Sequence, residues 1–316
     1  MSLIELWRRY RRSLVVIAVA LVLGCTFVIA YTLALGRPSL HQVPVAVMTP
    51  MSPQVTTAVA HLGIQPHEVP SVAAGIRQID LQQAYGLIAP DGPDGVNLYL
   101  CSACGYPVAS AIEHYAATTG TAATTTDLHP LPSSDPLGLN TFYLVIGASL
   151  LGMVGTFQLH VNSGISQVRQ WLVVLAVYAI SVGGVLAALI GPALGALPAP
   201  FLQTWLILTV YSTIVSMFAS TMLVLLGRWA IVPTWVQFIA FGNSSAGGTA
   251  PSPMLPGVYG QVGRFLPNGG AVAALHNASY FPEDERAFPY IVLVVWLTVV
   301  IVGFAASVRL LRRSTV

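Results

Sequence analysis

Apolar residues dominate six stretches of the chain, and each stretch is long enough to cross a lipid bilayer. They are Ser13–Leu35, Thr141–Leu159, Trp171–Ile190, Phe201–Leu226, Trp229 to about Gly248, and Tyr290–Leu311. A bilayer core about 30 Å thick requires about 20 helical residues, and longer stretches cross with some tilt. The pattern predicts a polytopic α-helical membrane protein with six transmembrane helices.

The arginines orient these predicted helices. Nine of the thirteen fall on one side of the membrane and four on the other. Because cytoplasmic loops are rich in basic residues, both termini are predicted to be cytoplasmic. Residues 1–12 are expected to form an amphipathic cytoplasmic lead in contact with membrane lipid. Residues 13–36 are predicted to be an uncleaved first transmembrane helix; the alternative is a signal peptide cleaved after Ala34-Leu35-Gly36.

Residues 37–139 carry most of the acidic residues and are predicted to form a small extracytoplasmic α/β domain. Strands are expected at Val43–Met48, Tyr85–Ile88 and Val96–Leu100. Helices are expected at Gln54–Leu62, Val72–Leu81 and Tyr106–Thr118. The tract Thr118–Pro136, rich in threonine and proline, is predicted to be a tether to the membrane.

The fifth stretch is too short to cross as one helix. Its apolar part, Trp229–Phe241, spans about 20 Å at about 1.5 Å per residue. The residues that follow are polar and rich in glycine, and such backbone is tolerated at membrane depth only inside protein or beside a wet cavity. A broken helix of this kind is typical of transporters. The alternative is a helix that ends early and continues as an external loop.

Composition excludes several classes of protein. Hydrophobic residues make up 55% of the 316 and charged residues only 8%, and every basic residue is arginine. Without lysine the chain has no P-loop, so any ATP that drives it is hydrolysed by another polypeptide. A net charge of +2 with dispersed arginines gives no reason to expect nucleic acid. The absence of charged residues from span interiors argues against ion-coupled carriers.

Few residues suggest chemistry, and no catalytic site is predicted. Cys101 and Cys104 stand in a C-x-x-C motif, for which an exported domain favours a structural disulfide. Redox activity, metal binding and free thiols are the alternatives. The histidines lack ligand spacing, so no metal site is predicted. In the second stretch Gly147, Ala148 and Gly152 are candidates for close helix packing, although glycine is also common in membrane helices generally.

The layout resembles that of ABC-type exporter permeases of the second class, in the branch related to the bacterial phage infection protein. The resemblance rests on the topology and on residues Phe241–Gly248, Pro251, Leu255-Pro256, Leu266-Pro267, Asn277 and Tyr280-Phe281. It implies a homodimer or heterodimer of permeases, each bound to a cytoplasmic ATP-binding subunit. It also implies a core at 140–316 whose broken fifth helix and external re-entrant segment 242–281 form an outer gate.

Two groups of site residues follow from that resemblance. Gate or hinge residues are expected at Gly242, Asn243, Ser244, Gly247, Gly248, Pro256, Pro267 and Asn277. The loop 160–170 is expected to couple to the ATP-binding subunit through His160, Asn162, Gln167 and Arg169. Re-entrant helices are expected at Val258–Phe265 and Gly270–Phe281.

The sequence therefore predicts a multi-pass cell-membrane permease that exports a hydrophobic or amphipathic substrate with energy from a separate subunit. The chain itself needs no cofactor, because ATP binds the partner. A different hypothesis is a membrane receptor or secretion-apparatus component that acts through residues 37–139. A third is an exported thiol oxidoreductase that uses Cys101.

Overall fold

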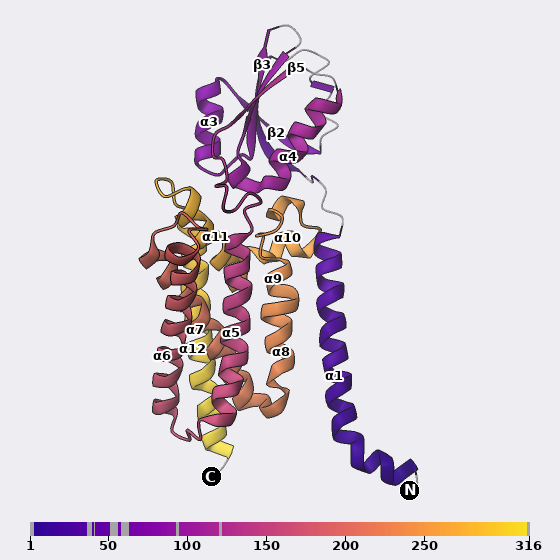
Figure 1. Cartoon of the computed structure of the whole chain (residues 1–316), viewed down its shortest axis with the longest axis vertical. Helices are drawn as coiled ribbons and strands as arrows, with labels where there is room; N and C mark the ends of the chain where they lie inside the picture. Colours follow the sequence, from indigo (N-terminus) through magenta and orange to yellow (C-terminus); the bar gives the residue numbers. More distant parts are fainter. Residues whose placement is uncertain are drawn as a thin grey trace.

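A computed structural model describes residues 3–36, 40, 42–50, 56–57, 63–92, 95–119 and 122–314. A small α/β domain stands on one end of a bundle of helices, and both ends of the described chain lie at the other end (Figure 1). The helix α1 (Leu3–Leu35) precedes the domain, and α5 (Asn140–Asn162) follows it. The domain is thus inserted between the first two long helices.

The domain is a five-stranded sheet with a helix on each face. Its strands are β1 (Val43–Met48), β2 (Ile64–Val69), β3 (Gly86–Asp91), β4 (Gly95–Leu100) and β5 (Ala122–Asp127), in the order β2-β1-β3-β4-β5. Strands β2 and β3 pair parallel to β1, β4 pairs antiparallel to β3, and β5 pairs parallel to β4.

Both faces of β1 are covered, which explains its almost continuous apolar sequence. On one face Val43, Val45 and Val47 pack in a cluster with Val108 and Ile112 of α4 (Ser102–Thr119). On the other face Ala46 packs in a cluster with Ile79 of α3 (Val72–Asp80).

The strand predictions at β1, β3 and β4 are confirmed, as are the helices α3 and α4. The tether predicted for Thr118–Pro136 is wrong over Ala122–Asp127, which pairs with β4 along its whole length. Its threonines are β-branched and favour a strand. Strand β2 was not predicted because it is polar and contains Pro66, which an edge strand tolerates. The helix predicted for Gln54–Leu62 lies outside the described residues except for Thr56 and Thr57, which are helical.

Among the described residues, five helical segments are long and apolar enough to cross a membrane. They are Ser13–Leu35, Asn140–Asn162, Val168–Ala193, Phe201–Ser244 and Phe288–Leu310. They correspond to α1, α5, α6 (Val168–Ala188) with the turn η1 (Leu189–Ala193), α7 (Phe201–Leu226) with its continuation, and α12 (Phe288–Ser314). This mostly helical architecture is consistent with a polytopic membrane protein.

The 44-residue segment Phe201–Ser244 folds back on itself. After α7 the chain reverses at Gly227, whose φ of +54° favours glycine. It continues through η2 (Gly227–Ala230), α8 (Ile231–Trp235), the π-helical turn η3 (Val236–Phe241) and α9 (Gly242–Ser244). The Phe238 ring lies 5.3 Å from the Phe218 ring and 6.4 Å from the Tyr211 ring. The segment therefore forms two antiparallel arms, a first arm (α7) and a second arm (α8 to α9).

Candidate functional site

The second arm ends in a run of buried polar residues. Asn243, Ser244 and Ser245 are each at most 2% exposed. The Ser244 hydroxyl donates to the Ala240 carbonyl at 2.7 Å, and the Ser245 hydroxyl donates to the Phe241 carbonyl at 2.7 Å. The last carbonyls of a helix have no intrahelical partner. The two serine hydroxyls supply hydrogen-bond donors to carbonyls at the end of the helix. The arm therefore ends inside the protein core without unpaired carbonyls at Ala240 and Phe241.

Asn268 ties this helix end to α11 (Pro267–Tyr280). Its side-chain amide donates to the Asn243 side-chain oxygen at 2.7 Å and to the Phe238 carbonyl at 3.0 Å. Asn268 is fully buried, while its own side-chain oxygen and the Asn243 amide nitrogen have no hydrogen-bond partner among the described residues. Sequence reasoning missed Asn268; the adjoining Pro267, which is favoured at the first position of a helix, was the available signal.

Three glycines allow the second arm, α10 (Val258–Gly263) and α11 to approach within backbone contact. A Cβ at Gly242 would overlap the Asn268 side chain, and one at Gly263 would overlap the Ser245 carbonyl. A Cβ at Gly269 would overlap the Gly263 carbonyl. Residues 242–245, 263 and 267–269 are called the interlock below. Any larger residue at these glycines forces the backbones apart.

A cavity of about 860 Å³ lies between the interlock and the α/β domain. The domain contributes Tyr85 and residues 102–107 to its lining, and the bundle contributes residues 246–253, 269–270 and 272–273. Asn268 directly precedes the lining residue Gly269, and Asn243 lies three residues before the lining residue Ala246, so their hydrogen bonds lie close to the bundle side of the cavity. Burial raises the pKa of the Tyr85 hydroxyl to about 12, with the nearby Arg286 charge lowering it slightly.

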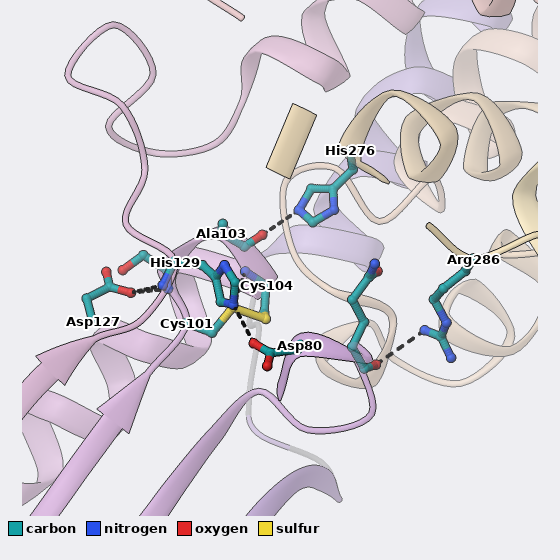
Figure 2. Close-up of a disulfide and its surroundings, with 10 residues drawn as sticks. Asp80, Cys101, Ala103, Cys104, Asp127, His129, His276 and Arg286 are labelled. Carbon is teal, nitrogen blue, oxygen red and sulfur yellow. Dashed lines mark hydrogen bonds and ion pairs between the residues drawn. A yellow bond between two sulfur atoms is a disulfide. The ribbon is translucent and has the colours of Figure 1, made fainter. Parts of the chain in front are cut away.

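The predicted disulfide between Cys101 and Cys104 is present, in the first turn of α4 beside the cavity (Figure 2). Cys104 lines the cavity, whereas Cys101 is fully buried. Thiol exchange requires an accessible sulfur. Burial of the first cysteine of the motif favours the structural role over the redox alternative.

Several polar contacts fix the domain on the bundle. The neutral His276 ring donates from Nε2 to the Ala103 carbonyl, beside the disulfide (Figure 2). Burial lowers the pKa of His276, while this carbonyl raises it. Arg286 donates to the Gln82 carbonyl at 3.3 Å, and Arg77 pairs with Asp284 at 3.1 Å. The domain therefore forms a wall of the cavity that is joined to the helices on several sides.

The predicted gate residues separate into two groups. Gly247, Gly248 and Asn277 line the cavity, with Gly247 at a φ of +81°. Gly242, Asn243, Ser244 and Pro267 belong to or adjoin the interlock beneath it. Pro256 lies apart from both groups, two residues ahead of α10. Helix α10 begins at Val258, where the re-entrant helix Val258–Phe265 was predicted to begin.

The predicted coupling residues lie at the far end of the bundle from the domain (Figure 1). His160 and Asn162 belong to the last turn of α5, Gln167 precedes α6, and Arg169 is in its first turn. All four are exposed. The His160 ring lies 5.9 Å from the Trp171 ring, whose nitrogen donates to Ser220 of α7 at 3.2 Å. The loop thus contacts two helices and presents an open polar face.

The predicted packing residues of α5 differ in their surroundings. A Cβ at Gly152 would lie 2.9 Å from Val215 of α7, and Ala148 is fully buried. At Gly147 nothing among the described residues lies within 4 Å of that position. The close approach of α5 to α7 is therefore at Gly152.

Comparison of the chain with protein-family models, curated proteins and solved structures found no match in any of the three. The case for a function therefore rests on the residues, the geometry of the cavity and interlock, and the resemblance stated for residues 241–281.

Proposed function

We propose that this chain is the membrane-spanning permease subunit of an ATP-driven exporter. The single observation that carries the proposal is a cavity at one end of the bundle that adjoins a polar, glycine-interlocked break in a helix. Broken helices at membrane depth form the substrate sites and gates of many transporters. The interlock is the closed outer gate, and a hydrophobic or amphipathic substrate leaves through the cavity.

In this proposal the two arms of Phe201–Ser244 cross the membrane separately, which makes six crossings with both termini cytoplasmic. The arginine distribution supports this orientation. So does the placement of both described chain ends at the end of the bundle away from the domain (Figure 1). The domain is then extracytoplasmic, and the loop 163–167 is cytoplasmic.

Helix α5 provides the mechanical connection between that loop and the gate. Its last turn carries His160, and its first turn carries Thr141, which lines the cavity. Next to Thr141, Phe142 packs so closely that a Cβ on Gly248 would lie 2.8 Å from its Cβ. A helix of this length spans about 35 Å as one rigid element. A partner that pushes on the loop therefore moves the rim of the cavity.

Energy is supplied by a separate cytoplasmic ATP-binding subunit, since the chain has no lysine with which to form a P-loop. Opening breaks the two Asn268 hydrogen bonds and the packing at Gly263. Net contributions of about 0.5–1.5 kcal/mol per hydrogen bond make this a change of a few kcal/mol. Such an equilibrium is within the range that a bound partner shifts. By the family resemblance, two permeases assemble as a homodimer or heterodimer.

The test is purification of the tagged chain from its host membranes in mild detergent. We expect a P-loop ATPase to co-purify with the chain, and Arg169→Glu in the exposed loop to abolish this association. Arg77→Gln, on the domain side, serves as the matched control and retains it. Absence of any ATPase, together with unchanged efflux of lipids and drugs in a deletion strain, would overturn the proposal.

A further inference from the structure

Cationic side chains line the cavity without any acidic counterpart. Arg264 and Arg286 are part of its lining, together with the neutral His276, and the described residues that line it include no aspartate or glutamate. Arg264 is exposed, and its guanidinium lies over the Phe265 ring at 4.7 Å. Arg286 contacts the neutral Gln82 carbonyl. Neither arginine forms an ion pair with a described carboxylate, so both remain available to bind an anion.

The nearest carboxylates are engaged elsewhere. Asp284 pairs with Arg77 at 3.1 Å. Glu285 accepts from Gln203 and from Tyr290, each at 2.7 Å. Asp135 accepts from the Leu139 amide at 2.8 Å and from the Tyr280 hydroxyl at 3.1 Å. None of these three carboxylates forms an ion pair with Arg264 or Arg286.

The arginines on the domain side of the protein are concentrated at the cavity. Residues 36–139 and 245–289 together contain four arginines and ten acidic residues, a formal charge of 4 − 10 = −6. Two of the four arginines nevertheless line the cavity. A partly enclosed site lined by one sign of charge concentrates ligands of the opposite sign. The cavity thus favours anions on a side of the protein that is otherwise acidic.

Two aromatic side chains, Phe265 and Phe288, lie beside the arginines of the cavity and are called the apolar lip below. The rings of Phe265 and Phe288 lie 5.7 Å apart, both are exposed, and both line the cavity. Phe288 is also the first residue of the apolar segment Phe288–Leu310. The lip therefore lies where the lipid-facing surface begins, with Arg264 directly beside it. A molecule placed here contacts the arginines with a polar head while its tail follows the apolar segment.

We propose that the cavity binds an amphiphile with an anionic head, a phosphate or carboxylate, held by Arg264 and Arg286 with its tail over Phe265 and Phe288. The arginine fork matches both anions in bidentate geometry. A volume of about 860 Å³ suffices for a head group and the start of a chain. This assignment rests on the proposed exporter and names its class of substrate.

The experiment measures binding of four detergent-like probes with twelve-carbon tails to the purified full chain in phosphatidylcholine nanodiscs. The probes are dodecyl phosphate, laurate, dodecyl maltoside and dodecyltrimethylammonium. We expect the two anions to bind more tightly than the other two by about tenfold or more. A preference between phosphate and carboxylate then identifies the head group.

Four variants assign the site. Arg264→Gln and Arg286→Gln are each expected to weaken binding of the anions about tenfold. Arg228→Gln, at an exposed arginine of η2 that does not line the cavity, leaves binding unchanged. Arg264→Lys retains the charge and recovers part of the affinity, which separates loss of charge from misfolding. Each variant is compared as a monodisperse preparation of equal thermal stability.

Equal binding of the cationic probe, or an equal loss in Arg228→Gln, would overturn the assignment. The measurement uses the chain without its ATPase, so its outcome is independent of the co-purification test. If the ATPase associates and the anions do not bind preferentially, the exporter stands and the substrate class is wrong. If anions bind and no ATPase associates, the cavity is an anionic-amphiphile site in a protein of another function.

Discussion

Helix α1 and the segment from α8 to α11 differ in two respects, the regularity of the helix and its burial by protein. Within Ser13–Leu35 only 6% of the most apolar window is buried by protein, and the helix is unbroken. The second arm and α11 are short, interrupted and deeply buried, with Asn243 and Asn268 at 2% and 0% exposure. Lipid accepts α1 because its backbone is paired internally. The interrupted segment persists only because protein covers it.

The contrast indicates where function resides. Helix α1 contacts the rest of the protein along one face. There the Trp235 indole nitrogen donates to the Leu23 carbonyl at 3.2 Å, and the Phe27 ring packs near the Trp235 ring. A buried break is costly unless its polar groups find partners. Proteins retain such breaks at functional sites. We therefore expect the two regions to respond very differently to equivalent substitutions.

The largest difference is expected between two glycine-to-alanine changes. Gly263→Ala places a methyl group on the Ser245 carbonyl, and overpacking of this kind destabilises by about 1–3 kcal/mol. Gly24→Ala on α1 meets nothing among the described residues within 4 Å, so its stability is unchanged or raised by up to about 1 kcal/mol. Thermal unfolding in nanodiscs measures both. Equal shifts would show that the interlock is no tighter than the lipid-facing helix.

The next effect concerns buried polar groups. Asn268→Ala leaves the Asn243 side chain and the Phe238 carbonyl without their donor, at a cost of about 1–3 kcal/mol. Thr26→Ala on α1 removes a hydroxyl that donates to its own helix at Val22 and changes stability by less than about 0.5 kcal/mol. Chemical denaturation of both variants, with Asn243→Ala/Asn268→Ala as a double-mutant cycle, gives the coupling. A coupling near zero would mean that the two asparagines do not hold the interlock together.

A smaller effect tests the contact between the two regions. Trp235→Phe keeps the ring against Phe27 and removes the hydrogen bond to Leu23. Interhelical hydrogen bonds in membranes average about 0.6 kcal/mol, so the loss should be of that size. Trp229→Phe, at an exposed position six residues earlier in the chain, is the control. A loss above about 2 kcal/mol would indicate that α1 is bound far more firmly than its burial implies.

The smallest expected effect is a pH dependence at the domain contact. The pKa of folded His276 is lowered by burial, so the unfolded chain binds its proton more readily. Stability from this group is therefore complete above an unfolded pKa of about 6.5 and declines as the pH falls toward the folded pKa. The melting temperature of the wild type should fall more than that of His276→Gln between about pH 7 and about pH 5. Identical profiles would remove His276 as the cause.

The sequence predicted those elements whose side chains repeat with a clear period. Apolar residues identified β1, β3, β4 and the long helices, because their burial is continuous. Strand β5 was hidden by threonines that resemble a linker by composition, and β2 by Pro66 at an edge. At the candidate site, Gly242–Gly248 stood out as a break in an apolar stretch. Asn268 did not, because its role depends on Asn243, 25 residues away. The cavity combines segments from Pro44 to Pro289 and has no local pattern.

The central claim is that the interlock is a gate that opens when the partner hydrolyses ATP. Ser245→Cys, with the free Cys25 replaced by serine, puts an isosteric thiol at a position only 1% exposed. Labelling by a membrane-impermeant maleimide from the outer side should be slow in cells depleted of ATP and at least about tenfold faster during turnover. Ser252→Cys in the cavity lining should label in both states, and Ser212→Cys in the bundle core in neither. Equal labelling of Ser245→Cys with and without ATP, with both controls behaving as stated, would contradict the account.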